Sequence, residues 1–299
     1  MNLLSEYSKK LTAFKIEAEK IFGYKSIRKF NYKKNFVFEI GIVTSSIDEF
    51  ESVKCLLDDV IEFDFDYDDP TIYYKGSITS NGKILNVILP LPNSIGLEAA
   101  VITTTKLIFN FTPQYVFMVG IAAGNKNISK IGDILIADKA LNYNQVVEIE
   151  KKGKEPVKKF MHSTDSINKN LKSRLNLFTN SNSIGLIRDQ FLNKKTIKTP
   201  LKCHIGLMVS GSSLVRSDSK IEEINQSYHG VVGLDMETYG FYFTAFNVLK
   251  DKAPYFVSIK SVSDYGDNSN HQLTAEERKN YALYTSSSAL ISFIKNHIK

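Results

Sequence analysis

From residue 36 onward the chain alternates continuous apolar segments with segments of helical periodicity, and this alternation constrains the fold most. Strands that are apolar throughout are buried on both faces of a sheet, and the helices between them provide the cover. The pattern therefore predicts an α/β fold: a single domain with a mixed, largely parallel central sheet flanked by helices. Strands are expected at 36–43, 72–78, 84–91, 115–122, 134–138, 204–210, 231–236 and 254–262, and helices at 47–61, 95–109, 237–249 and 275–297.

Two local patterns add detail to this fold. Asn81-Gly82 separates the second and third predicted strands, and this dipeptide is typical of a two-residue hairpin turn. The span 150–200 is lysine-rich and loop-rich, so we predict an insertion or a mobile segment there.

The first 34 residues differ from the rest of the chain. Their apolar side chains fall near one helical stripe with lysines between them, and Gly23 is a stop signal. We predict an N-terminal helical extension at 1–34 and one domain at 35–299. The apolar face of the extension is expected to pack within its own protein, with a protein partner as the alternative.

Composition narrows the function classes. The net charge is +6, but only five of the 38 basic residues are arginine, the residue that reads phosphate geometry in nucleic-acid grooves. No signal peptide or membrane-spanning segment is visible, and the two cysteines form no CxxC pair. We therefore expect a cytoplasmic protein that binds neither nucleic acid nor membranes.

Carboxylates at strand ends are the main candidates for chemistry. Ligands of open α/β sheets bind outside the carboxyl ends of the strands, where the sequence places Glu49, Glu237 and Asp264. Motifs for nucleotide loops, zinc proteases and serine hydrolases are absent, and the five histidines lack ligand spacing, so no metal or cofactor is expected. Taken alone, Asp264 before Gly266 is better explained by a turn than by a functional site.

Five further segments form one pattern along the chain. They are IGIVTSSIDEFESVKCLL (40–57), MVGIAAGNK with IGDILIAD (118–138), SGSSLV (210–215), DMETYG (235–240) and SVSDYGD (261–267). In order and spacing these segments resemble the superfamily of purine nucleoside phosphorylases and methylthioadenosine/adenosylhomocysteine nucleosidases, and the similarity covers about residues 36–297.

The resemblance implies a role for each carboxylate. Cleavage of an N-glycosidic bond forms an oxocarbenium-like sugar and an electron-rich leaving base. Asp264 would protonate N7 of the purine, Glu237 would accept hydrogen bonds from the ribose hydroxyls above Met236 as an apolar floor, and Glu49 would activate water. The resemblance also implies that Gly120, Ile121, Ala122, Leu214, Val215, Arg216 and Ser263 line the substrate site.

Glu49 favours hydrolysis over phosphorolysis. The first strand lacks the Gly-Asp-Pro phosphate turn, and no arginine occurs between Arg28 and Arg174. The alternative for Glu49 is an ordinary acidic residue at a helix N-terminus. Two departures from the family pattern are Ala123, where a second glycine is usual, and Leu214, where an aromatic residue stacks on the base in related nucleosidases.

The sequence therefore predicts an adenine nucleosidase that acts on a nucleoside or nucleotide. Segments 40–57 and 118–138 are most similar to nucleosidase-like domains of bacterial defence systems, which extends the expectation to ATP and antiphage defence. A phosphate-dependent purine nucleoside phosphorylase and a non-catalytic nucleotide-sensing module are the alternatives. The resemblance also implies a homo-oligomer.

Overall fold

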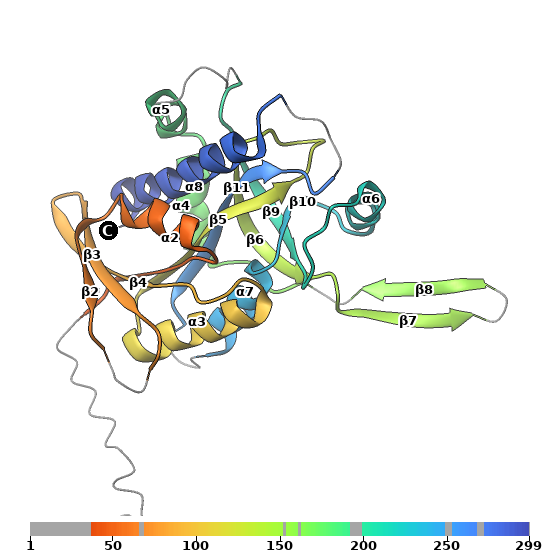
Figure 1. Ribbon diagram of the computed structural model, residues 1–299, viewed down its shortest axis with the longest axis horizontal. Coiled ribbons are helices and arrows are strands. Elements are labelled where there is room, and N and C mark those ends of the chain that lie inside the picture. The colour runs from red at the N-terminus through yellow and green to blue at the C-terminus, as the bar shows by residue number, and fades with distance from the viewer. Residues whose placement is uncertain are drawn as a thin grey trace, which may run out of the picture. The chain divides into compact units, whose positions relative to one another are not determined.

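The computed structural model describes residues 37–65, 69–151, 154–160, 163–191, 199–248, 253–267 and 272–298 (Figure 1). The predicted helical extension at 1–34 lies outside the described residues, so the division of the chain at residue 34 stays a prediction. No helix in the described ranges combines the length and the apolar composition needed to cross a bilayer.

A nine-stranded mixed sheet forms the centre of the fold, as predicted. The order of its strands is β10-β9-β6-β11-β5-β1-β4-β3-β2, with parallel and antiparallel pairings and an additional contact between β10 and β5. The strands are β1 (Ile40–Val43), β2 (Asp58–Phe63), β3 (Tyr73–Ser80), β4 (Lys83–Pro90), β5 (Tyr115–Gly124), β6 (Ile134–Asn142), β9 (Cys203–Ser210), β10 (Val231–Asp235) and β11 (Tyr255–Asp264).

The contact between β10 and β5 closes one end of the sheet into a ring of five strands. Gly233 pairs with Gly124 and Leu234 with Ala123 in this antiparallel contact. A Cβ on Gly233 would lie 2.7 Å from the Ala123 carbonyl oxygen, so glycine is needed for the two backbones to approach. The closure brings the end of β10 to the carboxyl ends of β5 and β11.

Helices cover both faces of the sheet. In Figure 1, α2 and α8 lie on one side, and α3 and α7 lie together on the other. The helices of the described residues are α2 (Ile47–Lys54), α3 (Leu97–Phe111), α4 (Lys169–Thr179), α5 (Ser183–Gln190), α6 (Asp218–Ser227), α7 (Thr238–Asn247) and α8 (Ala275–His297). The buried apolar side chains of the strands and helices form one large core and a smaller cluster beside α6.

The structure corrects three details. The helix predicted at 47–61 ends at Lys54, and its second part is the strand β2. The span 150–200 is not simply a loop, because β7 (Val146–Lys151) and β8 (Lys154–Phe160) pair there and are followed by α4 and α5. Helix α6 was not predicted. The hairpin at Asn81-Gly82 is confirmed, with φ values of 50° and 78°.

Candidate active site

Glu49 is held in place by the first turn of α2. Ser46 is the N-cap residue, and its side chain accepts from the Glu49 N–H in a capping box. The Glu49 Oε2 atom accepts from the backbone N–H groups of Ser45 (2.7 Å) and Ser46 (3.2 Å). Glu49 is therefore not an ordinary exposed acid of a first helical turn. Its side chain points inward, and only 3% of its surface is exposed.

The Glu49 carboxylate contacts the carboxyl end of β5. The Ile121 N–H donates to Glu49 Oε1 at 2.9 Å, and a Cβ on Gly120 would lie only 2.0 Å from the same oxygen. Any side chain at Gly120 would therefore displace Glu49. A carboxylate has about four acceptor sites, so the three backbone donors leave one for a further ligand.

Lys260 lies at the centre of the site, and the sequence analysis did not identify it. It pairs with Gly120 in the register of β11 and β5, and its side chain is fully buried. The Nζ atom is 3.8 Å from Glu49 Oε1, 3.8 Å from Asp235 Oδ2 and 3.7 Å from Glu237 Oε2. At these distances the ammonium makes ion pairs but no hydrogen bond within the described residues.

The charges of this cluster perturb one another. Burial alone would lower the pKa of the Lys260 ammonium, but the carboxylates of Glu49, Glu237 and Asp235 outweigh it and raise that pKa above its ordinary value. Burial raises the pKa of Glu237, with Lys260 opposing the rise and Asp235 and Glu49 adding to it. Such perturbed groups at strand ends are typical of functional sites.

Asp235 and Glu237 approach Lys260 from the turn between β10 and α7. Asp235 Oδ1 accepts from Ser210 Oγ at 2.6 Å, and its Oδ2 accepts from the Thr238 hydroxyl. Glu237 Oε1 accepts from the Gly96 N–H at 3.0 Å, which connects α7 to the start of α3. Met236 lies between the two acids and is half-buried. Both carboxylates are therefore fixed by contacts from other elements.

Asp264 ends β11 on the same edge of the sheet. Its carboxylate accepts from Ser263 Oγ (2.8 Å) and from the Gly266 N–H (2.8 Å), and Ser263 Oγ also lies 3.3 Å from the Ala122 carbonyl oxygen. Asp264 is four residues beyond Lys260, roughly 13 Å along a strand. A molecule bound along this edge of the sheet could contact both groups.

The loop between β9 and α6 lies beside this turn. The Ser217 N–H donates to the Gly266 carbonyl at 2.9 Å, which fixes the end of the loop next to Asp264. Leu214 is 68% exposed, Val215 is half-buried and Arg216 is exposed. The structure thus places the predicted Leu214–Arg216 segment at the rim of the site, on the side of Asp264.

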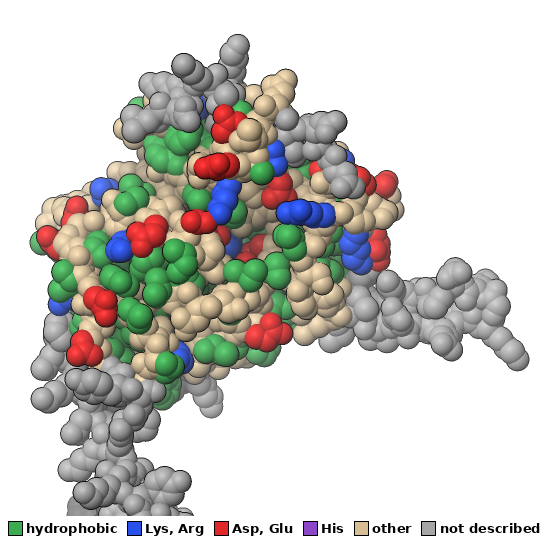
Figure 2. Space-filling model, viewed as in Figure 1, with side chains coloured by type: hydrophobic (Ala, Val, Ile, Leu, Met, Phe, Trp, Pro, Cys, Tyr) green, Lys and Arg blue, Asp and Glu red, His purple; other side chains and the backbone are tan. Residues whose placement is uncertain are grey.

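The predicted residues fall into two groups on one edge of the sheet. Glu49, Gly120, Ile121 and Glu237 surround Lys260, while Ala122, Ser263 and Asp264 lie together at the end of β11. Figure 2 shows this face hollowed between α2 and α8 on one side and α7 on the other, with acidic side chains inside. Within the described residues no group of His, Cys, Asp and Glu is arranged to hold a metal ion.

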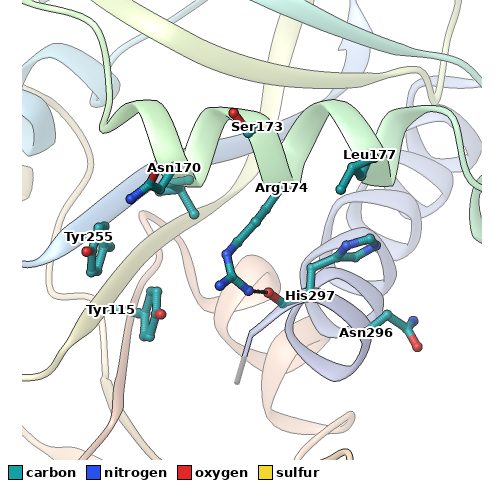
Figure 3. A pocket seen from close by; sticks show the side chains of 9 residues that line it. Tyr115, Asn170, Ser173, Arg174, Leu177, Tyr255, Asn296 and His297 are labelled. Atoms are coloured by element: carbon teal, nitrogen blue, oxygen red, sulfur yellow. Dashed lines mark hydrogen bonds between the residues drawn. The ribbon is translucent and has the colours of Figure 1, made fainter.

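A second hollow lies at the opposite ends of the strands. It has a volume of about 490 Å³ and is lined by Tyr115 and Tyr255, which begin β5 and β11, and by residues of α4 and the end of α8 (Figure 3). Its Arg174 donates to the main-chain oxygen of His297. Because none of the described residues that line this cavity carries a carboxylate side chain, we place the chemistry at the Lys260 edge instead.

A mixed α/β sheet that gathers buried carboxylates and a lysine at the ends of its strands defines an enzyme of the α/β class. Residues 39–295 match the phosphorylase superfamily. The match spans most of the chain, and the protein therefore belongs to that superfamily.

Individual relatives are nucleosidases. The 5'-methylthioadenosine/S-adenosylhomocysteine nucleosidase of Haemophilus influenzae (strain PittEE) is 29% identical over 77% of this chain and 87% of its own length. The ATP nucleosidase Cap17 of Escherichia coli (strain KTE188) is 22% identical over 63% of this chain. The chain spans 38% of the length of Cap17 and 48% of an uncharacterized relative from Sinorhizobium fredii.

Solved structures share the fold. The 5'-methylthioadenosine/S-adenosylhomocysteine nucleosidase of Neisseria meningitidis, in complex with methylthio-immucillin-A, superposes with a TM-score of 0.63. It is 20% identical to this chain, and the alignment covers 86% of this chain and 98% of the other. The predicted nucleoside phosphorylase-like fold is confirmed.

Proposed function

We propose that this protein is an adenine nucleosidase that hydrolyses the N-glycosidic bond of an adenine nucleoside or nucleotide. The observation that carries the proposal is the charge of the cluster at Lys260. Three carboxyl groups surround one ammonium there, so the acidic groups outnumber the basic one. Such a site repels a phosphate ion and accommodates neutral water, which favours hydrolysis over phosphorolysis.

Each residue has a role in the proposed reaction. Glu49 uses its remaining acceptor site to take a proton from water, whose oxygen attacks C1′ of the ribose. The C1′–N9 bond breaks, its electron pair goes to the purine, and Asp264 supplies a proton to N7. Glu237 accepts from the ribose hydroxyls, and the fixed negative charges of the cluster stabilise the positive sugar. Lys260 acts as a positioning residue that holds the carboxylates together.

The finer assignments are also proposals. The methylthioadenosine and ATP nucleosidases among the relatives support adenine as the base and either a nucleoside or a nucleotide as the substrate. The similarity to Cap17 supports a role in antiphage defence. A homo-oligomer is supported by exposed apolar side chains on the paired helices α3 and α7, namely Ile102, Phe109 and Phe243.

The test is base release by the purified protein. We expect free adenine from at least one of adenosine, methylthioadenosine, AMP and ATP, at a rate independent of inorganic phosphate, with an unphosphorylated C1′ hydroxyl in the sugar product. A rate that rises with phosphate, with ribose 1-phosphate as product, would identify a phosphorylase. Tight binding of these compounds without base release would identify a nucleotide-sensing module.

A further inference from the structure

Arg278 lies beside the strand end that carries Asp264. It is in the first turn of α8, and its Nε donates to the Ser263 carbonyl oxygen at 3.1 Å. Its Nη1 donates to the Leu273 carbonyl oxygen at 2.7 Å. Because Ser263 directly precedes Asp264, these two bonds hold the guanidinium next to the proposed general acid.

The charge of Arg278 is not neutralised within the described residues. A guanidinium has five N–H donors, and its two carbonyl contacts leave three of them unused. Two other basic side chains of this region are neutralised by ion pairs, because Lys279 pairs with Asp48 and Lys126 pairs with Asp267. Arg278 therefore presents a fixed, half-buried positive charge with free donors at the rim of the site.

The geometry of a nucleoside indicates that the positive charge of Arg278 lies on the side of the 5′ end of a bound substrate. In a β-nucleoside the base and the 5′ carbon project from the same face of the ribose, and the attacking water approaches from the other face. Glu49 lies on the water side and Asp264 on the base side of the proposed site. A cation held beside Asp264 is therefore on the side of the 5′ substituent.

The position of α8 supports the same placement. Its first turn is tied to the end of β11 through Arg278 and to the first turn of α2 through the Lys279–Asp48 ion pair. Asp48 is the neighbour of Glu49, so this turn of α8 connects the two halves of the site. A ligand that extends from the ribose past the base edge would meet this turn.

We propose that the Arg278 guanidinium binds the 5′-phosphate of the substrate, so that the protein prefers 5′-phosphorylated adenine nucleotides to free nucleosides. The inference rests on the proposed nucleosidase function and names its substrate class. A planar guanidinium with free N–H groups matches phosphate oxygens well. Arg216, the arginine that the sequence analysis placed in the site, is exposed and has no partner in the described part of the chain, so its side chain is not held toward the ligand.

The experiment compares kcat/KM for ATP, AMP and adenosine in the wild type and in Arg278→Gln. We expect the wild type to prefer the nucleotides, and the ratio of ATP to adenosine to fall on the order of 10- to 100-fold in the variant. Arg278→Lys, which keeps the charge but not the fork, should fall in between. Arg188→Gln is the charge-matched control, because Arg188 already pairs with Asp189 on helix α5, and its ratio should equal that of the wild type.

Three results would overturn the proposal. The first is a wild type that shows no preference for nucleotides, and the second is an Arg278→Gln variant that loses adenosine and ATP hydrolysis equally. The third is a change in the ratio of ATP to adenosine that is larger in Arg216→Gln than in Arg278→Gln. The second would show that Arg278 only clamps the end of β11. If Arg278→Gln does not fold, the proposal is tested by the nucleotide preference of the wild type and by the ratio of ATP to adenosine in Arg278→Lys. If the wild type releases base from no substrate, the proposed function fails, and calorimetric affinities for ATP and adenosine then test Arg278 alone.

Discussion

The cluster around Lys260 and the rim formed by Leu214, Arg216 and Arg278 differ in how firmly the fold fixes them. The cluster draws its four ionisable groups from α2, β10, β11 and the cap of α7, and each acid is held by backbone or hydroxyl donors. At the rim Leu214 is 68% exposed, and among the described residues the Arg278 guanidinium donates only to carbonyl oxygens. The difference indicates that the bond-breaking step depends on the packed core, whereas substrate choice depends on side chains that can change without unfolding it.

The largest effect is expected at the centre of the cluster. Lys260→Met leaves three buried carboxylates without their cation, so we expect base release to be lost and the free energy of unfolding to fall by about 3–5 kcal/mol. Urea denaturation and an adenine assay measure both changes. Lys260→Arg keeps the charge and is the control. A Lys260→Met protein as stable as the wild type would show that the ammonium does not hold the cluster.

The same ion pairs predict a pH dependence of stability. The carboxylates raise the pKa of Lys260 above its ordinary 10.5, so folding favours the protonated amine. This stabilisation is fully present below pH 10.5 and is lost as the pH rises through the folded pKa. The difference in unfolding free energy between wild type and Lys260→Met should therefore shrink as the pH rises above 10.5 and through the folded pKa.

Asp264 is expected to affect catalysis without affecting stability. It is half-buried and lies at a turn, so Asp264→Asn should fold normally, but an amide cannot protonate N7. We expect kcat to fall on the order of 10²–10⁴-fold with an unchanged melting temperature. A wild-type kcat in this variant would remove Asp264 from the role of general acid.

Glu237→Gln is expected to change both binding and turnover, on the order of 10- to 100-fold in kcat/KM. Its proposed hydrogen bonds to the ribose hydroxyls exist in the ground state and strengthen as the sugar becomes cationic. Separate measurement of KM and kcat distinguishes this from a purely catalytic role. If KM stays at the wild-type value, Glu237 does not bind the ribose before the reaction.

The smallest effect is expected at the rim. Leu214→Phe supplies the aromatic ring that the family resemblance of the sequence implies for this position, and stacking on the base should lower KM by about 2- to 10-fold. Because Leu214 is exposed, the melting temperature should not change. A large loss of stability would mean that this loop belongs to the packed part of the molecule.

The sequence predicted the carboxylates better than the contacts that join them. Glu49, Glu237 and Asp264 each follow a strand, and local patterns reveal such positions. Lys260 and Asp235 were missed because the four groups of the cluster come from four separate elements, and the long-range pairing of β10 with β5 leaves no local signal. One signal was available: Lys260 interrupts an apolar strand, a position where a charge requires buried partners.

The errors in the fold have a similar cause. In 47–61 the apolar side chains of Phe50, Val53, Leu57 and Ile61 keep helical spacing, so periodicity could not show that α2 stops and β2 begins. β2 is a strand because it pairs with β3, a contact decided by tertiary structure. By contrast, Asn81-Gly82 encodes its turn locally and was predicted correctly.

The most direct test of the account is Glu49→Gln. The amide nitrogen would face the Ile121 N–H or the Ser45 and Ser46 N–H groups, so we expect a loss of about 1–3 kcal/mol in stability but a folded protein. Calorimetric binding of a substrate nucleoside or nucleotide is the control for an intact site. The account predicts that this variant still binds its substrate but releases adenine at least 10²-fold more slowly, on the order expected for loss of a general base. Undiminished adenine release by a folded Glu49→Gln protein would contradict it.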